Sequence, residues 1–128
     1  MSKNGLVIED NKNNREILAA LLVQEGFAVT ALEKPVGIEA YLKNLDHLDI
    51  VFLDLEMPGL NGYDVLKIIR DHPRFGRVPV VAYTVHVSEL NQVKTQGFNA
   101  FLGKPLDIDR FPQYLEQILS RQSVWIVP

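Results

Sequence analysis

Short apolar runs alternate with amphipathic segments along the chain. Apolar runs typical of strands cover residues 6–8, 27–32, 50–53, 78–83 and 100–102. Between and after them, apolar side chains recur at helical spacing over residues 17–22, 38–45, 65–69, 88–96 and 111–119. This pattern predicts five strands alternating with five helices. Because short, almost wholly apolar strands are typical of a parallel sheet covered on both faces, we predict a doubly wound α/β domain.

The composition is that of one globular domain of 128 residues, 47% hydrophobic and 23% charged. A net charge of -3 argues against a nucleic-acid partner, whose phosphates require a basic surface. The absence of cysteine excludes disulfides and thiolate zinc sites. The opening stretch MSKNGLVIED has too short an apolar run for a signal peptide, and no segment approaches membrane-spanning length. We therefore expect a cytoplasmic protein without a membrane partner.

Polar side chains stand where four of the five predicted strands end. Glu9 and Asp10 follow the first strand, Asp54 the third, Thr84 the fourth and Lys104 the fifth. In a doubly wound sheet, ligands bind beyond the carboxyl ends of the strands. We therefore expect these five side chains to form one site.

The residue types at these strand ends indicate what the site holds. Three crowded carboxylates repel one another unless a cation bridges them. Oxygen ligands without Cys or His favour a hard divalent ion, Mg²⁺ before Ca²⁺. Thr84 can donate a hydrogen bond, and the positive charge of Lys104 suits a phosphoryl group. Together they predict a site for Mg²⁺ and for a phosphoryl group on a carboxylate nucleophile.

Four motifs in this order resemble the response-regulator receiver domain of two-component signalling: IEDN, FLDLEMPGLNGYDVLKIIR, VVAYTVH and AFLGKP. The resemblance runs from residue 6 to about residue 120. It implies a flavodoxin-like (βα)5 fold with strand order 2-1-3-4-5. We assign residues 1–122 to the receiver domain and residues 123–128 to a short apolar C-terminal tail.

The resemblance also implies a role for each residue of the phosphoryl site. Asp54 is the expected phosphoacceptor, and Thr84 and Lys104 are expected to contact the phosphoryl oxygens. Phe101 takes the place of the family's switch aromatic, although a core role is the simpler interpretation of this residue alone. The peptide bond between Lys104 and Pro105 is expected to be cis.

For Mg²⁺, the resemblance implies Asp10 and Asp54 as direct ligands. Glu9 is expected to act through a water and Glu56 through its backbone carbonyl. Asp10 or Asn11 can also cap the helix that follows, and that interpretation coexists with metal binding.

One position departs from the family pattern. The residue after the threonine is usually small, and here it is Val85, with His86 beside it. We expect both residues to lie at the rim of the site and Val85, whose χ1 is stiff, to narrow access to Asp54.

The resemblance implies a stand-alone response regulator, which is not an enzyme beyond its own phosphorylation and autodephosphorylation. Its expected partners are a histidine kinase or a histidine phosphotransfer protein and an unknown downstream protein. The alternatives are an aspartate-nucleophile phosphatase of the haloacid-dehalogenase type and a pseudo-receiver scaffold that is not phosphorylated. In the tail, SVWIVP, Trp125 either folds back onto the domain or contacts a second subunit or a partner protein, and contact with a second subunit would make a homodimer.

Overall fold

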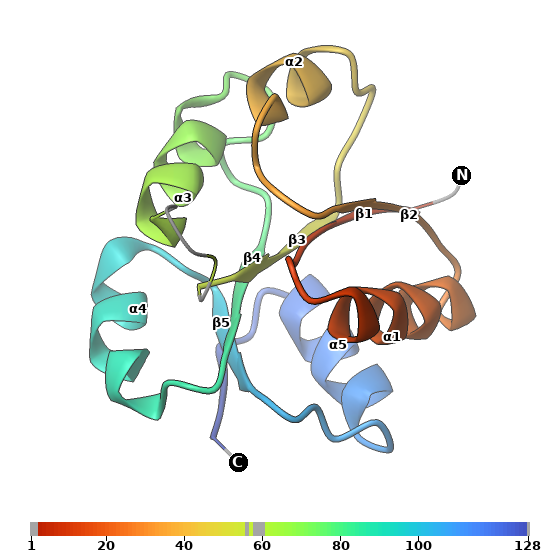
Figure 1. The fold of residues 1–128 in the computed structure, drawn as a ribbon, viewed down its shortest axis with the longest axis vertical. Helices are drawn as coiled ribbons and strands as arrows, with labels where there is room; N and C mark the ends of the chain where they lie inside the picture. Colours follow the sequence, from red (N-terminus) through yellow and green to blue (C-terminus); the bar gives the residue numbers. More distant parts are fainter. Residues whose placement is uncertain (1–2, 56, 58–60, 128) are drawn as a thin grey trace.

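The structure, a computed structural model, describes residues 3–55, 57 and 61–127. Within this part of the chain, one parallel sheet is formed by β1 (Lys3–Ile8), β2 (Phe27–Leu32), β3 (Ile50–Asp54), β4 (Val80–Thr84), β5 (Ala100–Gly103) and β6 (Val124–Ile126). The strand order is β2-β1-β3-β4-β5-β6. The predicted doubly wound sheet and the order of its first five strands are confirmed (Figure 1).

The prediction of a five-stranded sheet followed by a tail is wrong at the C-terminal end. Residues 124–126 form β6, which pairs in parallel with β5 and leaves Val124 only 3% exposed. The physical reason is that the edge of β5 has open backbone donors and acceptors, and Val, Trp and Ile all favour strands. The interpretation in which Trp125 folds back onto the domain is therefore confirmed.

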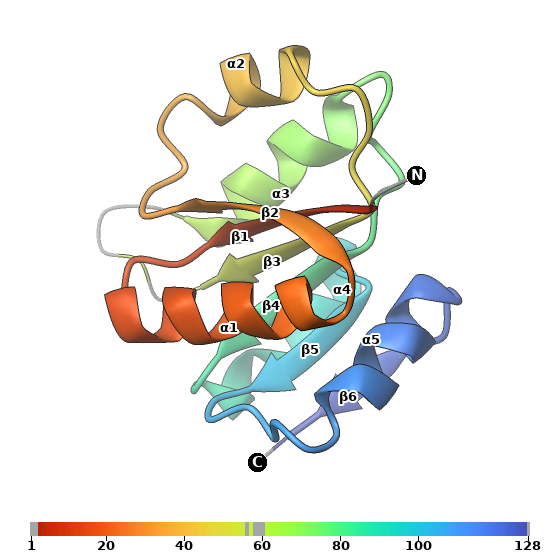
Figure 2. The ribbon, with the colours of Figure 1, turned by 90° about the vertical axis from the view of Figure 1, so that its right-hand side faces the viewer.

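The helices cover both faces of the sheet, as Figures 1 and 2 show. One face carries α1 (Lys12–Gln24) and α5 (Phe111–Leu119). The other carries α2 (Ile38–Lys43), α3 (Gly62–Asp71) and α4 (Leu90–Gln96), and a 3₁₀ turn, η1 (Val87–Glu89), precedes α4. Gly97 ends α4 with a φ of 102°, a conformation that favours glycine, as expected for a helix stop.

The core divides into two layers because alternate side chains of each strand point to opposite faces. In β4, Val80 and Ala82 pack on the side of α2, α3 and α4, whereas Val81 and Tyr83 pack on the side of α1 and α5. All four are at most 4% exposed. Burial on both faces explains why the strands read as nearly continuous apolar runs.

The chain changes direction across the sheet at β1. From β1 it moves outward to β2, and it then returns to the other side of β1 as β3. Such a switch point leaves an opening at the carboxyl ends of the two strands that flank it, here β1 and β3. Among the described residues, no helix is both long and apolar enough to cross a membrane.

Candidate functional site

The acidic pair Glu9–Asp10 lies in the short connection from β1 to α1. Asn11 is the N-cap of α1, and its side chain accepts a hydrogen bond from the Asn14 amide at 3.0 Å. Arg15 of the same helix donates to the Glu9 carbonyl at 3.0 Å. Cap and arginine together fix the backbone that carries both carboxylates. The capping role left open between Asp10 and Asn11 therefore belongs to Asn11.

Asp54 is the last residue of β3 and only 1% exposed. One carboxylate oxygen from each of Glu9, Asp10 and Asp54 lies within 4.8 Å of the others. Glu9 is fully buried, whereas Asp10 is partly exposed. The three acids predicted to converge are therefore brought together at the β1–β3 switch point.

Lys104 supplies the positive charge of this cluster. It directly follows β5, is 9% exposed, and its amide donates to the Thr84 carbonyl at 3.0 Å. Its Nζ lies 3.2 Å from Glu9 Oε1 and 3.3 Å from Asp54 Oδ1. The peptide bond from Lys104 to Pro105 is cis, as the resemblance implied.

Thr84 ends β4 and is fully buried. Its Oγ1 accepts a hydrogen bond from the His86 amide at 3.1 Å, which tethers the loop after the strand. Val85 and His86 are exposed, Val85 to 50%. Both therefore lie at the surface beside Thr84, and their effect on access to Asp54 remains a prediction.

One predicted residue, Phe101, stands apart from this cluster. Phe101 is fully buried in the core between the sheet and the helices α2, α3 and α4, beside Ala82 of β4. Its core role is confirmed, and its switch role remains a prediction. Glu56, expected to offer a backbone carbonyl to the metal, lies outside the described residues.

Sequence reasoning missed Arg15 and Tyr83. The ring of Tyr83 lies under the ammonium group of Lys104, with Nζ 4.6 Å from the ring centroid. Tyr83 stands one residue before Thr84, so position alone could have suggested it. The role of Arg15 depends on the path of the loop from Glu9 to Asn11, which no sequence pattern reveals.

The charges of the site are unequal. Three carboxylates and one ammonium group lie close together, so the cluster has a net formal charge of two negative units. A divalent cation would balance this excess, and the available ligands are the oxygens that Mg²⁺ prefers. A carboxylate oxygen beside a lysine, at an opening in the sheet, is also a suitable nucleophile for a phosphoryl group.

Solved structures resemble this fold closely. The chemotaxis response regulator CheY4 of Vibrio cholerae superposes with a TM-score of 0.82 at 19% identity, over 92% of this chain and 99% of that one. The receiver domain of a sensor histidine kinase from Pseudomonas aeruginosa PAO1, described with a magnesium ion coordinated in the active site cleft, gives 0.81 at 24% identity, over 94% and 99%. At these identities, the likeness shows the fold.

Curated relatives share sequence over nearly the whole chain. The response regulator DivK of Brucella ovis is 25% identical over 94% of this chain and 98% of its own length. The CAI-1 autoinducer sensor kinase/phosphatase CqsS of Vibrio cholerae is 29% identical over 94% of this chain, which spans only 17% of that kinase. The sequence model of the response regulator receiver domain matches residues 6–116. The chain therefore belongs to the response regulator receiver domain family.

Proposed function

We propose that this receiver domain is a phosphorylation switch that accepts a phosphoryl group on Asp54. The observation that carries the proposal is the position of Lys104, whose Nζ lies 3.3 Å from Asp54 Oδ1 inside a cluster of three carboxylates. A buried acid at the tip of a strand, next to a fixed cation, has the surroundings that a carboxylate nucleophile requires. The partner that donates the phosphoryl group is a histidine kinase or a histidine phosphotransfer protein.

In the transfer step, a carboxylate oxygen of Asp54 attacks the phosphorus of a phosphohistidine. The P–N bond breaks as the P–O bond forms, and the imidazole leaves with a proton from solvent. Negative charge on the phosphoryl oxygens increases next to Lys104, which stabilises it because the ammonium group is already in place. The buried hydroxyl of Thr84, at the end of the adjacent strand, is the second donor.

The phosphoryl group is lost by hydrolysis at the same site. A water molecule attacks the phosphorus, and the bond from phosphorus to the Asp54 oxygen breaks. Inorganic phosphate and the free carboxylate result, with release of a proton. The domain is therefore no enzyme toward other substrates, since the group that it hydrolyses is its own.

Mg²⁺ is the cofactor that the donor set fits. Asp10 and Asp54 would bind it directly, Glu9 would act through a water and Glu56 through its carbonyl. The support is the clustering of three carboxylate oxygens within 4.8 Å and the magnesium ion described for the Pseudomonas receiver domain. When bound, the ion neutralises charge on the phosphoryl oxygens.

The output of the switch is a phosphorylation-dependent contact with a downstream protein. That this chain acts as a stand-alone regulator is supported by DivK, whose length it spans almost completely. The match to CqsS supports a second arrangement, in which such a domain is part of a sensor kinase. In both arrangements, Asp54 has the same role.

The proposal is tested by asking whether the reaction stops at one phosphoryl group. The protein is incubated with acetyl phosphate and Mg²⁺ and then freed of the donor, and its mass is followed over time. We expect one added phosphoryl group that disappears after the donor is removed, and no turnover of p-nitrophenyl phosphate. Continuous hydrolysis of that phosphomonoester would show a phosphatase, and the absence of any added mass would show an unphosphorylated scaffold.

A further inference from the structure

The C-terminal strand β6 lies outside the part of the chain that matches the family. The family model ends at residue 116, whereas β6 spans Val124–Ile126. The alignments with the two solved structures described above include 99% of each of those chains, but only 92% and 94% of this chain. Beside β5, this chain therefore has a strand that the family model does not include.

The two faces of β6 contact different layers of the core. Val124 and Ile126 pack on the side of α1 and α5. Trp125 points to the opposite face and packs on the core that contains Phe101. Trp125 and Phe101 are directly paired in the register of β5 and β6, so they are cross-strand neighbours on one face of the sheet.

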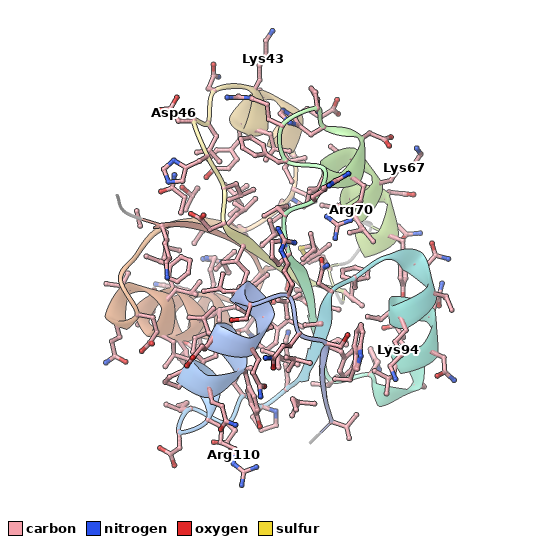
Figure 3. The ribbon with its side chains drawn as sticks, turned by 180° about the vertical axis from the view of Figure 1, so that it is seen from behind. Lys43, Asp46, Lys67, Arg70, Lys94 and Arg110 are labelled. Atoms are coloured by element: carbon pink, nitrogen blue, oxygen red, sulfur yellow. The ribbon has the colours of Figure 1, made fainter. Side chains whose placement is uncertain are left out.

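A side chain of α4 also contacts the Trp125 ring. The Nζ of Lys94 lies 5.3 Å from the centroid of the Trp125 ring, within the range of a cation–π interaction. Figure 3 shows Lys94 on the side of α4 that faces the last strands of the sheet. The indole therefore lies between Lys94 of α4 and the β5 strand that carries Phe101.

Phe101 has unequal neighbours along the sheet. Its partner in β4 is the small side chain of Ala82, and its partner in β6 is the large side chain of Trp125. Phe101 is fully buried, and it lies three residues before Lys104 on the strand that carries this lysine to Asp54. A shift of the Phe101 ring toward Ala82 and Thr84 would remove contact from Trp125.

We propose that Trp125 is a positioning residue that acts on the phosphoryl site through Phe101, and that β6 loosens from β5 when Asp54 is phosphorylated. The inference rests on the proposed function and adds an element that regulates it. Trp125 holds Phe101 away from Thr84 in the unphosphorylated protein. A three-residue edge strand depends on few contacts, so the loss of one aromatic contact weakens its pairing.

Coupling between two sites is reciprocal. If phosphorylation weakens the contact between Phe101 and Trp125, removal of that contact favours the arrangement that accepts the phosphoryl group. Because the labelling rate rises with the population of that arrangement, we expect Trp125→Ala to be labelled by acetyl phosphate at least about fivefold faster than wild type, which corresponds to the lower end of ordinary allosteric coupling. Trp125→Phe, which keeps a ring against Phe101, should restore a rate close to that of wild type.

Ile126→Ala is the matched control. Ile126 is the neighbouring residue of the same strand, but it packs on the side of α1 and α5, away from Phe101. The substitution shortens a side chain on the opposite face of β6 and leaves in place the contact between Trp125 and Phe101, through which the coupling acts. A labelling rate close to wild type in Ile126→Ala, beside a faster rate in Trp125→Ala, separates a positioning role from a merely structural one.

A second readout uses the protein's one tryptophan. Upon labelling, the Trp125 emission should shift to longer wavelength in proportion to the phosphorylated fraction measured by intact mass, and Asp54→Asn should show no shift. Full labelling by mass with unchanged emission and equal rates in Trp125→Ala and wild type would overturn this inference and leave the proposed function standing. No labelling of wild type would overturn both.

Discussion

At the scale of single residues, Lys104 decides the electrostatics of the site. Its ammonium group is within 3.3 Å of carboxylate oxygens of both Glu9 and Asp54, and it lies over the Tyr83 ring. These groups are almost entirely buried. A buried carboxylate that loses its partner is left with an uncompensated charge, so the lysine stabilises the fold in addition to its proposed role toward a phosphoryl group.

We predict that Lys104→Met lowers the free energy of unfolding by about 3–5 kcal/mol, the usual cost of breaking a buried ion pair. Urea unfolding measures this change, and added Mg²⁺ should restore part of the loss because it binds the folded carboxylates. Lys67→Met is the matched control, since Lys67 pairs with Asp71 on the exposed surface of α3 and its loss should leave the midpoint unchanged. A Lys104→Met protein as stable as wild type would contradict the assigned role of the lysine.

The residues of the site could be predicted because their positions follow from one rule. Asp54 and Thr84 are the last residues of strands, and parallel strands end at one edge. Glu9, Asp10 and Lys104 follow strands within two residues. Arg15 could not be predicted in the same way, and only the position of Tyr83 next to Thr84 could have suggested that residue. Their roles come from the path of a loop and from the approach of a side chain on a neighbouring strand, which are tertiary features.

At the scale of elements, Tyr63 links α3 to the segment that leads into α4. Its hydroxyl donates to Glu89 Oε1 of η1 at 3.4 Å. Its ring meets Phe98, just after α4, edge to face at a centroid distance of 5.8 Å. Burial, and to a lesser extent the Glu89 carboxylate, raise the pKa of Tyr63 to about 12.

The raised pKa of Tyr63 predicts that the folded protein loses stability at alkaline pH. The unfolded phenol ionises at its usual value near 10, while the folded phenol keeps its proton to about pH 12. The contribution of Tyr63 is therefore complete below pH 10 and falls as the pH rises through 12. Tyrosinate absorbance of wild type minus Tyr63→Phe gives the titration of this group, and Glu89→Gln should lower its pKa. A difference curve centred on the usual tyrosine value in the folded protein would contradict the assignment.

The strand β6 shows where element prediction from sequence fails. The run Val124, Trp125 and Ile126 has the residue types of a strand, but three residues are too few to establish a period. Whether such a run pairs with an edge, contacts a partner or stays free depends on which edge is open. That edge belongs to β5, and its position is known only once the sheet has been assembled.

At the scale of the whole molecule, the site is a consequence of topology. The chain reverses its direction of winding at β1, so Glu9 and Asp10 come to lie beside Asp54 although more than forty residues separate them. The alternation of strands and helices was sufficient to predict the doubly wound class. The strand order came from the resemblance to a family, because periodicity alone does not order strands.

The proposed switch requires that Asp54 accepts a phosphoryl group with the help of Mg²⁺. The most direct test is the intact mass of the protein after incubation with acetyl phosphate, for wild type with Mg²⁺, wild type with excess EDTA, and Asp54→Asn with Mg²⁺. We predict the added mass of one phosphoryl group in the first sample alone. Equal labelling of Asp54→Asn would rule out Asp54 as the phosphoacceptor, and labelling of wild type that is unaffected by EDTA would rule out the role of Mg²⁺.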